Sequence, residues 1–196
     1  MIISFEGGEG VGKSTHVKIL CAHLEQHGLP WLSFREPGGS PFCEGIRGLF
    51  FHKGLDTITE LLLILASRRE NIVKQVLPAL EQGKVVIIDR FIDSTMVYQG
   101  VLGGLGIGRV RELMEKTGTW IEPDLTFVLD VDPGHALKRI VPGDKFEERE
   151  PAFHQRLRQA FLDLATEARH CIIDADRPRD QVSNDILATV DRVLKL

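Results

Sequence analysis

The stretch from residue 2 to residue 14 reads IISFEGGEGVGKS, and it decides the fold. It opens with a short, largely apolar run of strand length, Ile2 to Phe5, and Gly7 to Ser14 then satisfies the pattern G-x-x-x-x-G-K-S/T. Beyond it, apolar residues recur at helical spacing, at Val17, Leu20, Cys21 and Leu24. A strand, a glycine-rich turn and an amphipathic helix in this order predict a phosphate-binding loop (P-loop).

The glycines allow successive backbone N–H groups to converge on a phosphate chain, and the following helix adds the positive end of its dipole. Lys13 would bring a charge to the β- and γ-phosphates of ATP, and the Ser14 hydroxyl would serve Mg²⁺. The alternative is a glycine-rich turn that only joins strand to helix, and the Lys-Ser ending weighs against it. We therefore expect ATP contacts from Gly7, Gly8, Glu9, Gly10, Val11, Gly12, Lys13, Ser14 and Thr15.

Four further apolar runs of strand length follow the loop, and helical patterns separate most of them. The strand candidates are Trp31 to Phe34, Val85 to Ile88, Leu125 to Leu129 and Cys171 to Ile173. The helical candidates span 57–82, 110–116, 134–139, 153–169 and 182–194. Alternating strands and helices imply right-handed crossovers. The sequence thus predicts an α/β fold of the P-loop NTPase type, a three-layer fold with a five-stranded parallel sheet and helices on both faces.

Two features of the helix predicted over 57–82 carry further expectations. The run from Leu61 to Ala66 is apolar all round, which predicts burial against the sheet on one side and against something else, such as a second subunit, on the other. Pro78 should kink the helix near its end. Three irregular stretches, 35–40, 99–108 and 141–148, should gather around the ligand at the carboxyl edge of the sheet.

Length and composition exclude several classes of protein. A chain of 196 residues fits one domain, 1–196. The formal charge of −4 argues against nucleic acid or an anionic membrane as partner, so any bound anion must be met by locally placed cations. The three cysteines lack CxxC or His clustering and predict reduced thiols. With no signal peptide pattern and no apolar run near ~20 residues, we expect a cytoplasmic protein.

Two aspartates at strand ends, Asp89 and Asp130, are candidates for the carboxylate that would join Ser14 at the Mg²⁺ ion. Asp89 is preferred because Arg90 follows it directly and offers a cation to the transferred phosphate, whereas a further acidic residue, Asp132, follows Asp130. For Arg90 the alternative role is a surface salt bridge. The sequence therefore predicts Ser14 and Asp89 as the metal-side residues.

The kind of P-loop protein follows from what accompanies the loop. The guanine-reading tetrapeptide Asn-Lys-x-Asp does not occur, and a motor or transporter ATPase would normally be longer. A small chain with isolated arginines suggests a kinase with a small anionic acceptor, since transfer to a phosphate oxygen needs positioning and charge neutralisation rather than a strong base. The candidate arginines for this role are Arg35, Arg47, Arg68 and Arg90.

Several segments in register resemble the thymidylate kinases of bacteria along nearly the whole chain. They are Phe5-Glu6-Gly7, Arg35-Glu36-Pro37-Gly38-Gly39, Asp89-Arg90-Phe91, Tyr98-Gln99-Gly100, Pro123 to Phe127 and Leu129-Asp130-Val131. The resemblance implies a homodimer packed through helices that include the Leu61 to Ala66 region. It also implies transfer of the ATP γ-phosphate to thymidine monophosphate, with Mg²⁺, for dTTP synthesis.

The resemblance also assigns roles on the acceptor side. Arg47 and Arg90 would clamp the acceptor phosphate with Arg35 nearby, and Glu9 would face the sugar and phosphate. Arg68 would donate to the thymine O4. Three further residues follow: Thr95 and Gln99 at the other polar edge of the base, and Tyr98 under the deoxyribose. Tyr98 could instead be plain core, and Thr95 a residue that starts a helix.

Two positions depart from the family's pattern. Ile64 stands where the family usually stacks a phenylalanine on thymine, one helical turn from Arg68. The lid, about 138–149, is short, and its cations are Lys138, Arg139, Lys145 and Arg149. We expect Arg139 and Lys145 to join Lys13 and Arg90 as catalytic cations.

Two other functions stay open. One is a nucleoside-monophosphate kinase with another or a relaxed base preference, because the stacking position has changed. The other is a nucleotide-dependent switch that binds ATP without transferring phosphate. Arg47, Arg68 and Arg90 weigh against a switch, which has no reason to line an acceptor pocket with cations.

Overall fold

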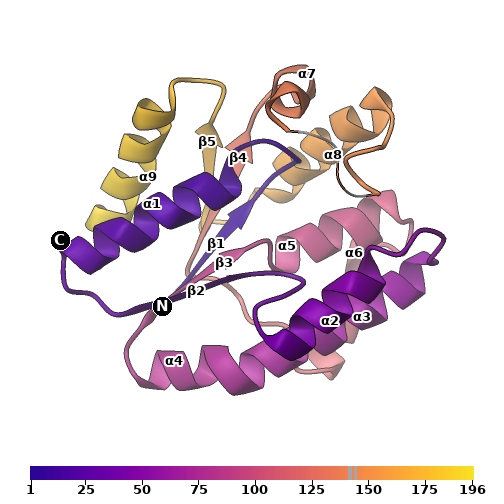
Figure 1. Cartoon of the computed structure of the whole chain (residues 1–196), viewed down its shortest axis with the longest axis horizontal. Coiled ribbons are helices and arrows are strands. Elements are labelled where there is room, and N and C mark those ends of the chain that lie inside the picture. Colours follow the sequence, from indigo (N-terminus) through magenta and orange to yellow (C-terminus); the bar gives the residue numbers. More distant parts are fainter. Residues whose placement is uncertain (141–142, 144) are drawn as a thin grey trace.

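The computed structural model of the chain describes residues 1–140, 143 and 145–196. Its centre is a parallel sheet of five strands in the order β2-β3-β1-β4-β5 (Figure 1). The strands are β1 (Ile2–Glu6), β2 (Trp31–Arg35), β3 (Val85–Asp89), β4 (Leu125–Asp130) and β5 (His170–Asp174). The predicted α/β fold with a five-stranded parallel sheet is confirmed.

The register of the strands brings polar residues to one edge of the sheet. Asp89 is level with Phe5 of β1 and with Arg35 of β2, and Asp130 is level with Asp174. β1 and β3 are buried along their whole length, as expected for central parallel strands covered on both faces. The loops that leave the carboxyl ends of these strands therefore start from the middle of the protein.

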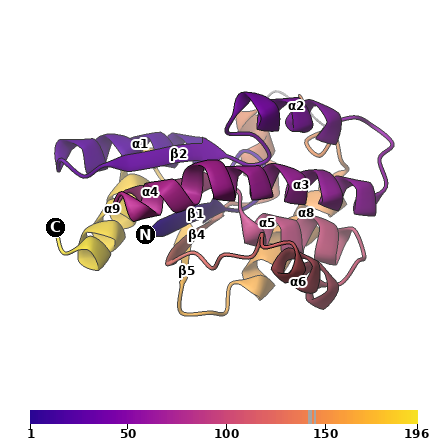
Figure 2. The same ribbon diagram turned by 90° about the horizontal axis from the view of Figure 1, so that it is seen from below.

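Helices cover both faces of the sheet (Figures 1 and 2). On one face, α1 (Lys13–Gln26) and α9 (Arg179–Leu194) pack on the strands through a continuous apolar cluster. The other face is covered by α3 (Thr57–Asn71), α4 (Leu77–Glu81), α5 (Ile92–Thr95), α6 (Ile107–Lys116) and α8 (Pro151–Leu164). The short helix α7 (Pro133–Ala136) and the 3-10 turn η3 (Leu137–Arg139) lie beside the phosphate loop.

The helix predicted over 57–82 is present, and its regular hydrogen bonding changes near Pro78. A π-helical turn, η1 (Ile72–Val76), separates α3 from α4. Pro78 has no N–H, and its ring would clash with the carbonyl four residues earlier, so a wider turn before it is the expected adjustment. On the single chain the run from Leu61 to Ala66 is not buried on both sides, because Leu62 is 57% exposed.

Three helical segments were not predicted, and the short helix α5 is one of them. α2 (Pro41–Phe50) lies alongside α3, and Ser40 caps it by accepting the Cys43 N–H at 3.2 Å (Figure 2). The stretch 99–108 was predicted to be irregular, yet a π-helical segment, η2 (Met96–Leu102), occupies its first part. Within the part of the chain that the structure describes, none of the helices combines the length and apolar character needed to cross a bilayer.

Candidate active site

The phosphate loop joins β1 to α1 at the carboxyl edge of the sheet. Gly7, Gly10 and Gly12 have φ values of 130°, 71° and 98°, which only glycine adopts readily. A Cβ on Gly7 would also lie 2.6 Å from the Leu129 carbonyl oxygen, so the loop passes directly over β4. The strand, loop and helix arrangement predicted from the sequence is therefore present.

The Lys13 side chain is buried in the loop itself. Its Nζ donates to the carbonyls of Gly8 at 2.6 Å and Gly7 at 3.2 Å. Burial, followed by the neighbouring charge of Arg90, lowers the pKa of Lys13 to about 8. Phosphate oxygens bound there would oppose both effects, because negative charge favours the protonated amine.

Ser14 and Asp89 meet on the metal side of the loop. The Ser14 hydroxyl donates to Asp89 Oδ2 at 2.5 Å. Asp130, the competing aspartate, is instead paired with Arg158 at 2.6 and 2.9 Å. A hydroxyl next to a carboxylate is the oxygen chemistry that Mg²⁺ takes, and Mg²⁺ usually completes its shell with substrate phosphates and water. The two residues thus fit the predicted ion, and the described residues hold no larger metal-ligand cluster.

Arg90 and Glu9 form the central ion pair of the site. Arg90 has a left-handed backbone, φ 67°, and its guanidinium donates to Glu9 Oε2 at 2.7 Å and to the Gly7 carbonyl at 3.0 Å. The Tyr98 hydroxyl donates to the other Glu9 oxygen at 2.7 Å. Burial alone would raise the pKa of Glu9, but the charges of Arg90 and Lys13 hold it down at about 2. Glu9 is therefore an anion at every working pH.

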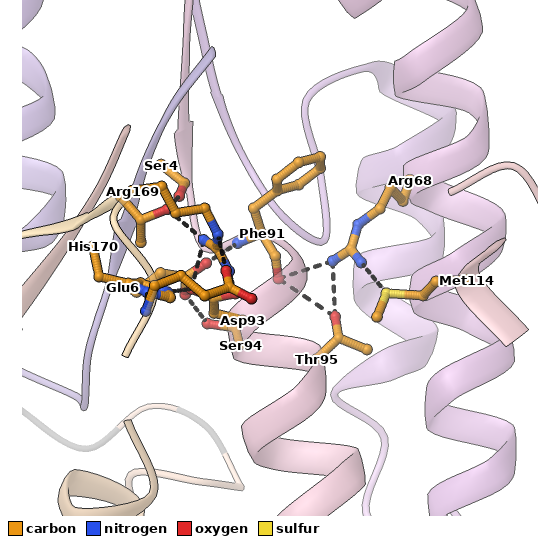
Figure 3. A network of polar contacts seen from close by, with 12 residues as sticks. Ser4, Glu6, Arg68, Phe91, Asp93, Ser94, Thr95, Met114, Arg169 and His170 are labelled. Carbon is orange, nitrogen blue, oxygen red and sulfur yellow. Dashed lines mark hydrogen bonds and ion pairs between the residues drawn. The ribbon is translucent and has the colours of Figure 1, made fainter. Parts of the chain in front are cut away.

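Arg68 lies deeper, with 1% of its surface exposed. Its Nε donates to Glu36 Oε2 at 2.6 Å. Its Nη2 donates to Thr95 Oγ1 at 2.8 Å and to the Phe91 carbonyl at 3.1 Å (Figure 3). Among the residues that the structure describes, its Nη1 contacts only a weak acceptor, the sulfur of Met114, at 3.2 Å. The guanidinium is thus fixed in place, with Nη1 the nitrogen most open to a stronger acceptor.

A second network in Figure 3 binds the backbone N–H of Phe91, the residue whose carbonyl accepts from Arg68. Glu6 Oε1 accepts the Phe91 N–H at 2.8 Å, and Oε2 accepts the Ser94 hydroxyl at 2.5 Å. Behind Ser94, Asp93 is paired with Arg169 at 2.7 Å and with His170 at 2.9 Å. Burial and then the charge of Asp93 raise the pKa of Glu6 to about 7.

This second network was missed by the sequence analysis. Its signal was a charged residue, Glu6, directly after the largely apolar run Ile2 to Phe5.

One cavity of about 620 Å³ runs along this edge, within the usual range of ligand pockets. Most of the predicted residues line it: Glu9, Gly10, Val11, Gly12, Lys13, Ser14, Thr15, Arg35, Arg47, Ile64, Arg68, Asp89, Arg90, Thr95, Tyr98, Gln99 and Arg139. Gly7 and Gly8 lie on the opposite side of the loop, facing β4 and α8. Of the predicted side chains that the structure describes, Lys145 is the one outside this lining.

At one end of the cavity the walls are apolar and aromatic. Ile64 packs in a cluster with Phe50 and Phe146, and Phe51 packs against that cluster. The Arg47 guanidinium lies 4.6 Å from the centre of the Phe51 ring, and its Nη1 donates to the Pro37 carbonyl at 2.9 Å. This end combines a flat apolar surface with the buried donors of Arg68.

At the opposite end lies a group of residues that the sequence analysis missed. They are His16, Ala175, Arg177, Arg179 and Val182, contributed by α1, by the loop after β5 and by the start of α9. Their signal was the Arg-Pro-Arg run just after the last strand, at the same edge as the other loops. The cavity therefore extends on both sides of the phosphate loop.

The predicted lid cations occupy different places. Arg139 lines the cavity and donates to Asp176 at 3.1 Å. Lys145 is nearly buried, and its Nζ donates to Glu60 Oε1 at 2.5 Å and to the Phe50 carbonyl at 2.7 Å. The lid prediction also covers Val141, Pro142 and Asp144, which lie outside the described residues.

A P-loop fold whose cavity also carries several arginines beyond the loop is typical of the phosphotransferases. Comparison with known proteins identifies which one. Residues 5–186 match the family model described as "Thymidylate kinase". The chain belongs to the thymidylate kinase family.

Individual relatives agree with this. The chain is 41% identical to a thymidylate kinase of Symbiobacterium thermophilum, covering 99% of this chain and 94% of the relative. It is 39% identical to one from Chlorobium chlorochromatii, covering 100% and 96%. The solved structure of thymidylate kinase from Ehrlichia chaffeensis superposes with a TM-score of 0.78 at 34% identity, covering 97% of this chain and 98% of that one.

Proposed function

We propose that the cavity holds Mg²⁺-ATP and thymidine monophosphate on either side of the transferred phosphate. Some of the residues named above would bind the donor nucleotide, and the others would bind the acceptor. The reaction is that of the family: the chain is an ATP-dependent enzyme that phosphorylates thymidine monophosphate to thymidine diphosphate, toward dTTP. The observation that carries the arrangement is the single cavity that joins Lys13, Asp89 and Arg90 to the aromatic end.

On the donor side, the loop amides and Lys13 would hold the β- and γ-phosphates, as P-loops do. Ser14 and Asp89 would hold Mg²⁺, which when bound neutralises charge on the phosphates. Arg177 and Arg179, near the far end of the cavity, support placing the adenosine part there. Arg139 lines the cavity and is our candidate for the cation that faces the transferred group.

On the acceptor side, Arg90 and Arg47 would hold the phosphate of thymidine monophosphate, with Arg35 at the rim. The attacking oxygen already carries negative charge, so it needs orientation and nearby cations rather than a general base. Glu9 and Tyr98 would face the sugar.

The base would lie at the aromatic end. Its flat face would rest on Ile64, and Arg68, Thr95 and Gln99 would meet its polar edge. Because the Met114 sulfur that Arg68 Nη1 contacts is a weak acceptor, an O4 acceptor would be a better partner for it. Lys145 is tied to Glu60, so a direct contact with the phosphoryl group would require that ion pair to open.

We also propose a cytoplasmic homodimer formed through the outer face of α3 and α4. Leu62, Val73 and Leu77 share one helical face and are 57%, 42% and 43% exposed. An exposed apolar stripe of this kind is typical of a surface that a partner covers. Sedimentation equilibrium of the wild type and of Leu62→Glu tests it, since a monomeric wild type would contradict the proposal.

A coupled assay with ATP and a panel of nucleoside monophosphates tests the catalytic assignment. We expect the highest kcat/KM with thymidine monophosphate, and lower values with the uridine, cytidine, adenosine and guanosine monophosphates. Lys13→Ala should abolish turnover without unfolding the protein, because its side chain contacts loop carbonyls rather than the apolar core. Near-normal turnover by folded Lys13→Ala would refute the assignment of the phosphate loop. Equal turnover across the panel would favour the relaxed base preference that Ile64 suggests.

A further inference from the structure

We propose that Glu60 is a positioning residue of the acceptor pocket, which fixes the side-chain amide of Gln99 so that its oxygen serves as the hydrogen-bond acceptor for the base. This inference rests on the proposed function, in which Gln99 lies at the base. Glu60 is not part of the cavity lining, and neither the sequence patterns nor the family resemblance pointed to it.

The carboxylate of Glu60 bridges two residues that are remote in the chain. One oxygen accepts the Lys145 ammonium at 2.5 Å, and the other accepts the Gln99 Nε2–H at 3.2 Å. The side chains of Glu60 and Lys145 are 13% and 9% exposed, and Gln99 is 1% exposed. These three residues come from α3, η2 and the segment after η3, so the bridge joins separate elements of the pocket wall.

The chemistry of a carboxylate determines which way the amide faces. An ionised carboxylate only accepts hydrogen bonds, so the amide nitrogen of Gln99 must face Glu60 and the amide oxygen must face away. That oxygen, Oε1, is buried and has no hydrogen-bond partner among the described residues. An unpaired buried acceptor is costly, and Gln99 lines the cavity, so a ligand N–H is the natural partner.

The resulting pattern selects among pyrimidines. An acceptor at Gln99 and a donor at Arg68 match a base with N3–H and O4, which thymine and uracil have. Cytosine presents the opposite pair, an acceptor at N3 and an amino donor at the neighbouring position. Turning the Gln99 amide over would make the pocket tolerate cytosine, and Glu60 is the group that prevents it. Lys145 in turn holds Glu60 and anchors it to the end of α2 through the Phe50 carbonyl.

Glu60→Gln tests this, because an uncharged amide both donates and accepts and no longer dictates the orientation of Gln99. The readout is the ratio of kcat/KM for thymidine monophosphate to that for deoxycytidine monophosphate. We expect it to fall roughly tenfold, the order set by one buried hydrogen bond. The matched control is Glu70→Gln on the same helix, outside the cavity lining, which should leave the ratio unchanged.

A double-mutant comparison separates positioning from a general structural effect. In a Gln99→Met background the ratio is already reduced, and adding Glu60→Gln should not reduce it further. If Glu60→Gln does not fold because the Lys145 ammonium loses its counter-charge, the double variant Glu60→Gln/Lys145→Gln, which removes both charges of the pair, replaces it, and its effect on the ratio should likewise disappear in the Gln99→Met background.

An unchanged ratio in a folded variant that lacks the Glu60 carboxylate would overturn the proposal, as would an equal effect with and without Gln99. Failure of the proposed function looks different, since the wild type would then show no preference for thymidine monophosphate.

Discussion

Replacing Glu6 with glutamine is expected to change how the stability of the protein depends on pH. Glu6 is fully buried at the end of β1, and both of its oxygens accept hydrogen bonds, from the Phe91 amide and the Ser94 hydroxyl. Burial, then the negative charge of Asp93, raises the pKa of Glu6 from its ordinary 4.5 to about 7 in the folded protein. The unfolded chain exposes this carboxyl and removes both causes.

The sign follows from proton linkage. Between pH 4.5 and 7 the folded protein holds a proton on Glu6 that the unfolded chain releases, so this group's stabilising contribution is complete below pH 4.5 and is lost as the pH rises through about 7. Each pKa unit corresponds to about 1.4 kcal/mol, so the full contribution is roughly 3 kcal/mol. Glutamine stays neutral at every pH and lacks this dependence, while its amide oxygen still accepts the Phe91 N–H.

Urea unfolding of wild type and Glu6→Gln at pH 5 and pH 8 measures the effect. The difference in unfolding free energy between the two proteins should shift by about 2–3 kcal/mol over this interval, in favour of the variant at the higher pH. Titrating groups remote from Glu6 are common to both proteins and cancel in the difference. Glu70→Gln controls for the loss of any one carboxylate. Parallel pH profiles for wild type and Glu6→Gln would refute the reasoning.

Two further predictions concern the cavity. Arg139→Met should lower kcat about tenfold or more and change the KM for thymidine monophosphate little, because a cation that faces the transferred group acts mainly in the transition state. Steady-state assays test this, and a raised KM with unchanged kcat would assign Arg139 to substrate binding instead. Ile64→Phe should lower the unfolding free energy by about 1–3 kcal/mol, because Ile64 already packs against Phe50 and Phe146 and a larger ring overfills that space. Urea unfolding and calorimetric titration with thymidine monophosphate check it, and unchanged stability with tighter binding would show that the pocket has room for the ring.

The features that the sequence predicted are those that local pattern controls. Continuous apolar runs such as Val85 to Ile88 are typical of central parallel strands, and all five strands lie where these patterns placed them. The phosphate loop was predictable because backbone conformation demands glycine at Gly7 and Gly12 whatever the rest of the fold does. In contrast, the π-helical segment Met96–Leu102 has no such local signature, and it was predicted in part as a loop.

The pairing of the charged residues could not be predicted, because it depends on contacts between remote parts of the chain. Arg68 and Glu36 are 32 residues apart, and Lys145 and Glu60 are 85 apart. Sequence reasoning therefore treated each arginine and lysine as an available cation, whereas the structure pairs each of these two with a buried carboxylate. The role of Glu60 was hidden for the same reason, since nothing local marks it as the partner of Gln99.

These pairings explain how a chain with a formal charge of −4 can bind two anionic nucleotides. A buried cation without a counter-charge would be costly, so Arg90 is held against Glu9 at 2.7 Å. An arriving phosphate need not displace Glu9 completely, because a guanidinium has five N–H groups and can serve two anions. Glu9 in turn keeps the Tyr98 hydroxyl as a second donor at 2.7 Å, so it is not left unsatisfied if Arg90 turns toward the phosphate. On the proposed assignment, phosphate binding is an exchange of partners within a prearranged site, which requires no basic surface around it.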